Sequence, residues 1–228
     1  MSRGCLIVFA KAPRVGRVKT RLVPPLSFEQ ATAFYDAMLR DVLDATARFA
    51  AELDLEPVLA VDPPSAVEEL RARTPSAFRI RAQRGAGLGE RMANAFAEAF
   101  ATGAPRVLLR GSDSPGLSAA HVSEMLDALE AEHDLVVCPD RGGGYAMIGQ
   151  GGPEPGIFDV PMSTPEVLGD TLALAEGLGL RHTVIASTFD LDTAADIVHL
   201  DDLIRVKALD LCPRTVETRE RLRSDRVL

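Results

Sequence analysis

The chain has 228 residues, of which 46% are hydrophobic and 25% charged, with a formal net charge of −8. Such a composition is typical of a globular protein long enough to bury a substantial core. Diffuse nucleic-acid or anionic-membrane surfaces need a spread of lysine and arginine, so we expect neither a nucleic-acid nor a membrane partner.

The cysteines and the N-terminal segment indicate an intracellular setting. Cys5, Cys138 and Cys212 have neither metal-ligand nor disulfide spacing. No apolar run reaches the roughly 18 residues of a membrane span, and the first ten residues resemble a strand more than a signal peptide. We therefore expect a cytoplasmic protein.

Short apolar runs alternate with longer amphipathic stretches, a pattern typical of βα units around a mainly parallel sheet flanked by helices. The predicted strands are Cys5–Ala10, Pro57–Val61, Phe78–Arg81, Val107–Arg110, Leu135–Cys138 and His182–Ala186. The predicted helices are Ser27–Phe49, Ser65–Arg73, Leu88–Ala101, Ser118–Ala131, Thr164–Gly177 and Asp196–Leu209. Ser27, Ser65 and Ser118 are the expected N-caps.

Two segments depart from this alternation. Gly142 to Pro161 is rich in glycine and proline around the apolar run Tyr145–Ile148, which predicts an inserted hairpin or a substrate loop. The charged tail from about Cys212 predicts a loosely docked helix. No linker or repeat divides the chain, so we expect one α/β domain over residues 1–228.

A basic loop follows the first predicted strand. From Met1 to Phe28 six residues are basic and none is acidic, and five of the six lie between Lys11 and Arg21. Ligands of open parallel sheets bind outside the carboxyl ends of the strands, where backbone amides and cationic side chains can converge on a polyphosphate. The sequence therefore predicts a phosphate site, with an exposed, solvated loop as the alternative.

A glycine-rich turn, Gln83 to Arg91, follows the third predicted strand and leads into a helix. Its backbone groups could hold a base or ribose edge. Glycines at such a place equally often serve the turn itself, so both interpretations stay open.

Acidic residues follow two other strands. Asp113 lies at a strand end beside glycine and proline, which favours a magnesium ligand over an Asx-turn or a helix cap. Asp190 and Asp192 alternate after the last strand and would point to one side, with Asp192 deeper in the site, if the strand continued. Asp192 could instead cap the following helix.

Several other chemistries lack their signatures. The four histidines, His121, His133, His182 and His199, share no ligand spacing, and no HExxH occurs. Ser112 and Ser114 lie in no GxSxG elbow, which argues against a serine hydrolase.

Six stretches of the chain together resemble a known family. They are VFAKAPRVGRVKTRL, GLGERMANAF, LLRGSDSPGLS, GGGYAMIG, STPEVLGDTL and DLDTAADI. In this order they resemble bacterial transferases of the Rossmann-like GT-A fold described as radical-SAM/selenodomain-associated or arsenosugar-biosynthesis transferases. The fold is shared with the 2-phospholactate, phosphoenolpyruvate and molybdenum cofactor guanylyltransferases, and with nucleotide-sugar glycosyltransferases.

The resemblance implies a role for each segment. The first loop would contact the nucleotide phosphates, through Ala10, Lys11, Arg14, Gly16, Lys19 and Arg21. The glycine-rich turn would lie near the base, through Gln83, Gly85, Gly87, Leu88 and Gly89. Mg²⁺ or Mn²⁺ would bind Asp113 and Asp192, which with Lys19 form the expected catalytic set. The acceptor would lie near Gly143, Gly144, Tyr145, Ser163 and Thr164.

This chain also departs from the family pattern. The relatives commonly have Cys-Pro-Asp after the first acid and Asp-Gly-Gly-Tyr later, where this sequence has Ser114-Pro115-Gly116 and Gly142-Gly143-Gly144-Tyr145. Two carboxylates expected near the second substrate are therefore missing.

Three functions remain open at this stage. The leading expectation is transfer of a nucleoside monophosphate from a triphosphate to a small phosphorylated or hydroxylated acceptor, with release of pyrophosphate. The alternatives are a glycosyltransferase using a nucleotide-sugar and a non-catalytic nucleotide-binding protein. Whether the chain forms a homodimer is also left open.

Overall fold

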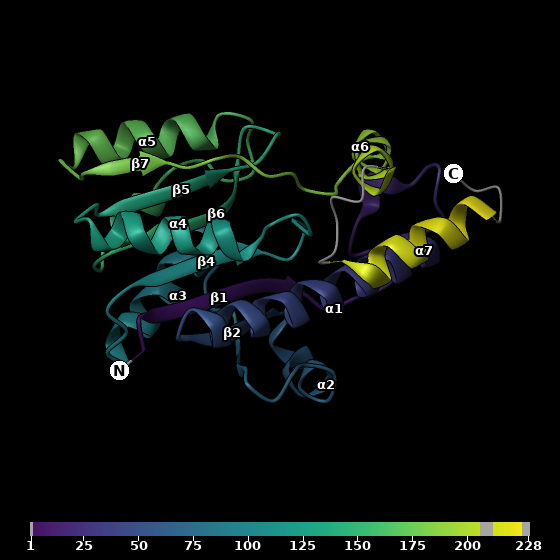
Figure 1. The fold of residues 1–228 in the computed structure, drawn as a ribbon, viewed down its shortest axis with the longest axis horizontal. Coiled ribbons are helices and arrows are strands. Elements are labelled where there is room, and N and C mark those ends of the chain that lie inside the picture. The colour runs from purple at the N-terminus through teal and green to yellow at the C-terminus, as the bar shows by residue number, and fades with distance from the viewer. Residues whose placement is uncertain (1, 206–211, 225–228) are drawn as a thin grey trace.

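The computed structural model describes residues 2–205 and 212–224, with the side chains of 203–205 left aside. Seven strands form one mainly parallel sheet with helices on both faces, which confirms the predicted α/β class (Figure 1). The strands are β1 (Gly4–Lys11), β2 (Leu55–Asp62), β3 (Arg79–Ala82), β4 (Val107–Gly111), β5 (Leu135–Pro139), β6 (Tyr145–Gln150) and β7 (His182–Val184). The helices are α1 (Phe28–Glu52), α2 (Val67–Arg71), α3 (Leu88–Ala101), α4 (Ala119–Glu130), α5 (Val167–Gly177), α6 (Ala194–Arg205) and α7 (Pro213–Ser224).

The order of the strands in the sheet is β3-β2-β1-β4-β6-β5-β7. β6 runs antiparallel to both of its neighbours, β4 and β5, whereas the other pairs are parallel. The carboxyl ends of the parallel strands and the start of β6 therefore lie at the same edge of the sheet.

The position of β6 corrects one prediction. Tyr145 to Gln150 does form a hairpin with β5, but this hairpin is part of the main sheet instead of an insertion, because β6 also pairs with β4 and is therefore an interior strand. The short apolar run was correctly found, but its pairing with β4 is non-local and leaves no signal in its own residues.

The central strand β1 is buried on both faces, as expected for a parallel strand covered by helices. Leu6 and Val8 pack on the face that α1 covers, while Ile7 and Phe9 pack on the face that α3 covers. This alternation follows from the two-residue period of a strand. The strand order places the end of β1 in the interior of the sheet edge, between β2 and β4.

Two of the three predicted N-caps are confirmed. Ser27 caps α1 by accepting a hydrogen bond from the Gln30 N–H, and Ser118 precedes α4 with its N–H donating to His121 Nδ1. The Ser65 cap is wrong, because Pro64 begins a 3-10 turn that contains Ser65, and α2 begins only at Val67.

Other element boundaries differ modestly. The last predicted strand ends at Val184 instead of Ala186, and the helix predicted from Thr164 begins at Val167. The helix predicted from Asp196 begins at Ala194, and residues 206–209 of that prediction lie outside the described residues.

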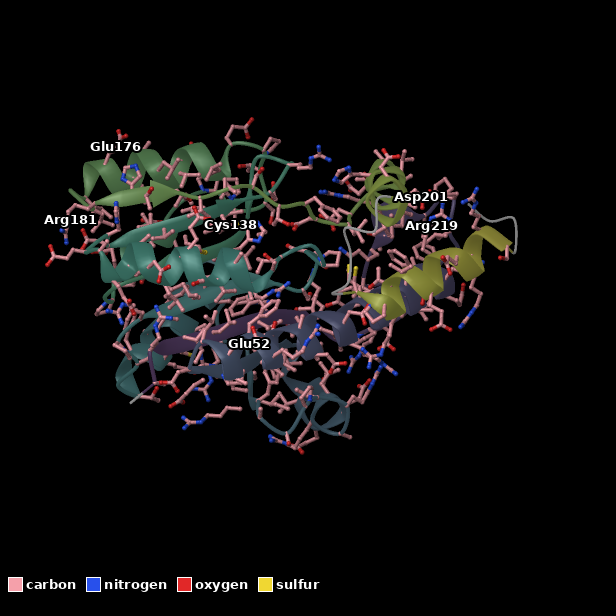
Figure 2. All side chains as sticks on the ribbon, viewed as in Figure 1. Glu52, Cys138, Glu176, Arg181, Asp201 and Arg219 are labelled. Atoms are coloured by element: carbon pink, nitrogen blue, oxygen red, sulfur yellow. The ribbon has the colours of Figure 1, made fainter. Side chains whose placement is uncertain are left out.

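The tail helix α7 packs against α1 more firmly than the predicted loose docking (Figure 1). Asp41 of α1 is 1% exposed and accepts hydrogen bonds from the backbone N–H and the hydroxyl of Thr215, at 2.7 and 2.8 Å. In the middle of α7, Arg219 pairs with Asp201 of α6 (Figure 2). Within residues 2–205 and 212–224, no helix is long and apolar enough to cross a bilayer.

Candidate active site

A cavity of about 770 Å³ opens at the carboxyl edge of the sheet. Its walls are formed by the segments that follow β1, β3, β4, β5 and β7, together with the residues that precede α5. This is where a parallel α/β sheet is expected to bind its ligand.

The basic loop is anchored by apolar residues and presents its charges to the surface. Ala12, Val18 and Leu22 are buried. The cationic side chains of Lys11, Arg14, Arg17 and Arg21 belong to exposed residues, and none of them pairs with an acid among the described residues. Unpaired cations on a loop fixed from below are available to an anion.

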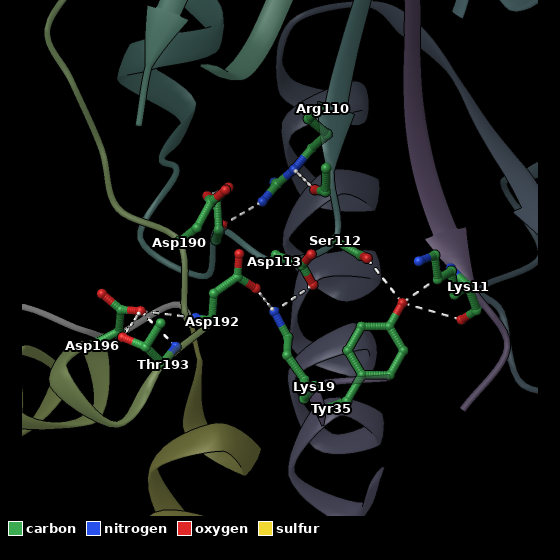
Figure 3. A network of polar contacts seen from close by, with 12 residues as sticks. Lys11, Lys19, Tyr35, Arg110, Ser112, Asp113, Asp190, Asp192, Thr193 and Asp196 are labelled. Atoms are coloured by element: carbon green, nitrogen blue, oxygen red, sulfur yellow. Dashed lines mark hydrogen bonds and ion pairs between the residues drawn. The ribbon is translucent and has the colours of Figure 1, made fainter. Parts of the chain in front are cut away.

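Lys19 is the exception in this loop. Its side chain is 3% exposed, and Nζ lies 2.7 Å from Oδ1 of Asp113 and 2.7 Å from Oδ1 of Asp192 (Figure 3). Burial lowers the pKa of Lys19, but the two carboxylates outweigh it and the net pKa is raised. The ammonium therefore stays charged and holds together two acids, Asp113 and Asp192, that lie far apart in the chain.

Asp113 has a carboxylate oxygen with no hydrogen bond. Oδ1 is buried and contacts Lys19 as an ion pair, but no donor of hydrogen-bonding geometry reaches it. The Asp113 side chain as a whole is 39% exposed, and the residue lines the cavity. Among the described residues no backbone N–H donates to Oδ1, so this oxygen forms neither an Asx-turn nor a helix cap.

The segment after β7 is not a continued strand, which corrects the geometry expected for its acids. Asp190 accepts a hydrogen bond from the Ser114 hydroxyl, whereas Asp192 pairs with Lys19 (Figure 3). The cap of the following helix comes from Asp196, whose Oδ2 accepts from the N–H groups of Asp192 and Thr193. The carboxylate of Asp192 is thus left for the site.

Asp190 lies over a buried arginine. Arg110 is 1% exposed and donates to the Ser114 carbonyl at 2.7 Å, while burial lowers its pKa to about 10. The pKa of Asp190 is raised to about 7, mainly because the side chain is buried. The hydrogen bond from Ser114 lowers this pKa, whereas the negative charges of Asp113, Asp140 and Asp192 raise it further.

Tyr35 of α1 fastens the ends of β1 and β4 to each other. Its hydroxyl oxygen accepts from the Lys11 N–H and donates to the Lys11 carbonyl, both at 3.1 Å, with Ser112 Oγ 2.9 Å away as a second donor (Figure 3). The residue is 2% exposed, and burial raises its pKa. This contact fixes the basic loop relative to Asp113.

The glycine-rich turn supports the site mainly by its shape. Gln83 donates through Nε2 to the carbonyls of Ala10 and Ala60, at 3.3 and 3.0 Å, which leaves its Oε1 for a ligand. Gly85 has φ +136°, and a Cβ at Gly89 would lie 2.5 Å from the Phe158 carbonyl oxygen. These two glycines serve the turn and the packing of α3.

Asp140 organises the opposite wall. Its Oδ1 accepts from the N–H groups of Gly142 and Gly144, at 2.6 and 2.9 Å. Gly143 has φ +87°, and a Cβ there would lie 2.0 Å from the Pro165 carbonyl oxygen, so only glycine fits. The loop is therefore fixed against the segment that begins α5.

Tyr145 lies between this loop and the floor of the cavity. Its hydroxyl approaches Met162 Sδ at 3.8 Å, and burial raises its pKa to about 12. Ser163 and Thr164 follow Met162 on the same wall.

Most of the residues singled out from the sequence line this cavity. They are Ala10, Lys11, Lys19, Arg21, Gln83, Gly87, Leu88, Asp113, Gly144, Tyr145, Ser163, Thr164 and Asp192. Gly16, Gly85, Gly89 and Gly143 do not line it, and Arg14 lines a neighbouring hollow of about 420 Å³ that shares Lys11 and Arg17 with the main cavity.

Sequence reasoning assigned no role to four residues of this site. Tyr35 and Arg91 lie within helices, where one polar side chain gives no signal of its position in the fold. Asp140 and Asp190 follow strands, as Asp113 does, so the rule that selected Asp113 could also have selected them. Asp190 was noticed but was not assigned a role.

The donor set is compatible with magnesium. Asp113 offers a buried oxygen without a hydrogen bond, and Asp192 lies beside it on the same ammonium. No group of three or more His, Cys, Asp or Glu side chains with metal-holding geometry occurs among the described residues. Two carboxylates suit Mg²⁺, which usually takes its other ligands from substrate phosphates and water.

A family comparison covers much of this site. Residues 45–164 match the family described as "Uncharacterized protein conserved in bacteria (DUF2064)", a range of 120 of the 228 residues. The chain belongs to the DUF2064 family. The match extends from α1 through Asp113 and the Asp140 loop, but it does not include the basic loop. No curated protein matches the sequence significantly.

Solved structures place this DUF2064 protein in a known fold. A protein from Desulfovibrio desulfuricans G20, provisionally named a nucleotide-diphospho-sugar transferase, is 27% identical with a TM-score of 0.80, covering 97% of this chain and 98% of its own. A 4-diphosphocytidyl-2C-methyl-D-erythritol synthase is 17% identical, with a TM-score of 0.59, and the alignment covers 90% of this chain and 99% of the synthase chain. A CMP:2-keto-3-deoxy-manno-octonic acid synthetase complexed with CTP is 13% identical, with a TM-score of 0.55, and the alignment covers 89% of this chain and 98% of the synthetase chain.

These similarities support the expected transferase fold at a coarse level. The DUF2064 protein shares its architecture with the provisionally named nucleotide-diphospho-sugar transferase and with these two cytidine-nucleotide synthases. The more specific relationship to guanylyltransferases stays a prediction.

Proposed function

We propose that this DUF2064 protein is a Mg²⁺-dependent nucleotidyltransferase. It would move a nucleoside monophosphate from a triphosphate to a small phosphorylated or hydroxylated acceptor and release pyrophosphate. The observation that carries the proposal is the contact of the buried Lys19 ammonium with Asp113 and Asp192, at the point where the unpaired cations of the first loop meet the acids of the sheet edge.

The chain's own residues would bind and orient the reactants. Lys11, Arg17 and Arg21 line the cavity and would hold the β- and γ-phosphates, since arginine and lysine are the usual partners of phosphate oxygens. Gln83 Oε1 and the backbone of Gly87 would face the base or ribose. Positioning and electrostatic stabilisation supply most of the rate in phosphoryl transfer.

Asp113 and Asp192 would hold the metal, with Lys19 keeping the two carboxylates together. A bound Mg²⁺ would neutralise charge on the α-phosphate. In the transfer, an acceptor oxygen forms a bond to the α-phosphorus, and the bond from this phosphorus to the oxygen bridging to the β-phosphate breaks. Pyrophosphate leaves with the electron pair, and a hydroxyl acceptor also releases its proton to water.

The test is pyrophosphate release with each of the four triphosphates, with and without Mg²⁺, over a panel of acceptors. Asp113→Ala should lower kcat/KM by more than tenfold, about 1.4 kcal/mol of transition-state stabilisation. Asp54→Asn is a suitable control, because Asp54 is exposed and precedes β2 at the opposite edge of the sheet. A loss of less than tenfold for Asp113→Ala would contradict its role as a metal ligand.

One observation favours a second candidate, a nucleotide-sugar glycosyltransferase. The similar protein from Desulfovibrio desulfuricans G20 carries the name of a nucleotide-diphospho-sugar transferase. However, Asp113-Ser114-Pro115 lacks the second acid of a short Asp-x-Asp, and the first loop carries more positive charge than a diphosphate needs. Tighter calorimetric binding of nucleotide-sugars than of triphosphates would favour this candidate.

A further inference from the structure

The charges that line the cavity divide by position. Every cation comes from the first loop or from α3, and every carboxylate comes from the segments after β4, β5 and β7. The cations are Lys11, Arg17, Lys19, Arg21 and Arg91, and the carboxylates are Asp113, Asp140, Asp190 and Asp192.

The strand order turns this division into two halves of one cavity. β3 and β1 carry the cationic segments at their ends, whereas β4, β5 and β7 lie on the other side of β1. Lys19 with Asp113 and Asp192 marks the boundary between the halves. The cationic half suits the triphosphate, so the acceptor would bind in the other half.

No cation lines the acceptor half among the described residues. Arg141 is exposed but does not line the cavity. Arg110 lies beneath it, 1% exposed, with its donors directed to Ser114, Thr46 and Gly111. Arg110 is therefore not placed to receive an anionic group of an acceptor.

The acids of this half are held in place by the surrounding structure. Asp140 is fixed by the N–H groups of Gly142 and Gly144, and Asp190 by the Ser114 hydroxyl. The neighbouring wall offers Tyr145, Ser163 and Thr164, which are neutral hydrogen-bonding residues. Carboxylates and hydroxyls recognise hydroxyl and amino groups of a ligand, and they repel phosphate and carboxylate.

We infer that the acceptor is a hydroxyl- or amine-bearing molecule without a phosphate or carboxylate group. This inference rests on the proposed nucleotidyl transfer and narrows its acceptor class. Arginine and lysine are the usual side-chain partners of phosphate, and here the lining cations all belong to the other half of the cavity.

The test compares matched probes on the whole protein. Calorimetry would compare the binding of glycerol with that of glycerol 3-phosphate, and the binding of ethanolamine with that of phosphoethanolamine. Each titration would contain Mg²⁺ and the triphosphate that stabilises the protein most. Pyrophosphate release would be followed with the same pairs. We expect the uncharged or cationic member of each pair to bind at least tenfold more tightly and to react faster.

A charge variant gives a second, independent readout. Thr164→Lys introduces a cation on the acceptor wall and should improve binding of the two phosphorylated probes at least fivefold. Ser76→Lys is the matched control, because Ser76 is exposed and lies outside the cavity, and it should leave probe affinities unchanged. Thermal melting of both variants would establish that they fold.

The possible outcomes separate the two proposals. If a triphosphate binds and the phosphorylated probes bind as well as their partners, the acceptor inference is wrong while nucleotide transfer stands. If no triphosphate stabilises the protein, the proposed function is wrong and the inference that rests on it also fails. A Thr164→Lys variant that folds but gains no affinity for the phosphorylated probes would likewise contradict the inference.

Discussion

Lys19 Nζ and Asp192 Oδ1 lie 2.7 Å apart, although the two residues are 173 positions apart in the sequence. Asp113 shares the same ammonium at 2.7 Å. Lys19 adopts a left-handed backbone conformation, with φ 48° and ψ 37°, that turns its side chain inward while its neighbours in the loop remain exposed. One lysine of the basic loop thus positions carboxylates, and the others are free for an anion.

Lys19→Met should destabilise the fold by about 1 to 3 kcal/mol, because it leaves the buried Asp113 oxygen beside a second carboxylate without a cation. This value is smaller than the loss expected for a fully buried ion pair, since both carboxylates are partly exposed to solvent, which screens their charge. Urea unfolding measures this loss.

Lys11→Met is the matched control for stability, because Lys11 is an exposed lysine of the same loop without an acidic partner among the described residues. Its cost should stay within about 0.5 kcal/mol. Equal losses in the two variants would show that the contacts of Lys19 contribute nothing.

Asp113→Asn and Asp192→Asn should each weaken the Mg²⁺-dependent part of nucleotide binding. A ligand that binds only the folded state raises its melting temperature by mass action, so the additional shift seen with Mg²⁺ should shrink. Thermal melting with a triphosphate, with and without Mg²⁺, measures this difference. Asp54→Asn should retain the full shift, and retention of the shift in Asp113→Asn would mean that the metal binds elsewhere.

Tyr35→Phe should cost about 1 to 3 kcal/mol, because it removes the hydroxyl that satisfies both backbone groups of Lys11 and contacts Ser112. Ser112→Ala should cost less, since the Lys11 bonds remain. Because the two residues touch, the double variant should lose less than the sum of the single losses. Additive losses in urea unfolding would rule out a shared network.

Asp41→Ala should detach α7 from α1 and destabilise the protein by about 1 to 3 kcal/mol, because Thr215 loses the acceptor of two buried bonds. Asp44→Ala is a matched control, since Asp44 binds the same Arg214 at 2.7 Å but is 47% exposed. An exposed pair is worth about 1 kcal/mol or less. Limited proteolysis should cleave the tail of the Asp41 variant first, and equal cleavage of both would argue against the buried contact.

The sequence by itself determined the elements that local patterns control. Apolar runs marked six strands near their observed places, and Ser27 and Ser118 were correctly recognised as caps because a cap depends on residues within one helical turn. Acids and cations after strands indicated which edge would bind a ligand, since the carboxyl ends of parallel strands share one edge.

Only the tertiary structure decided which of these residues meet. The antiparallel placement of β6, the bonding of Tyr35 to Lys11 and Ser112, and the pairing of Lys19 with Asp113 and Asp192 all join segments far apart in the chain. Whether a charged side chain faces solvent or a partner depends on backbone direction at that residue and on the elements packed against it. The basic loop could therefore be found from its composition, but the distinct position of Lys19 within it could not.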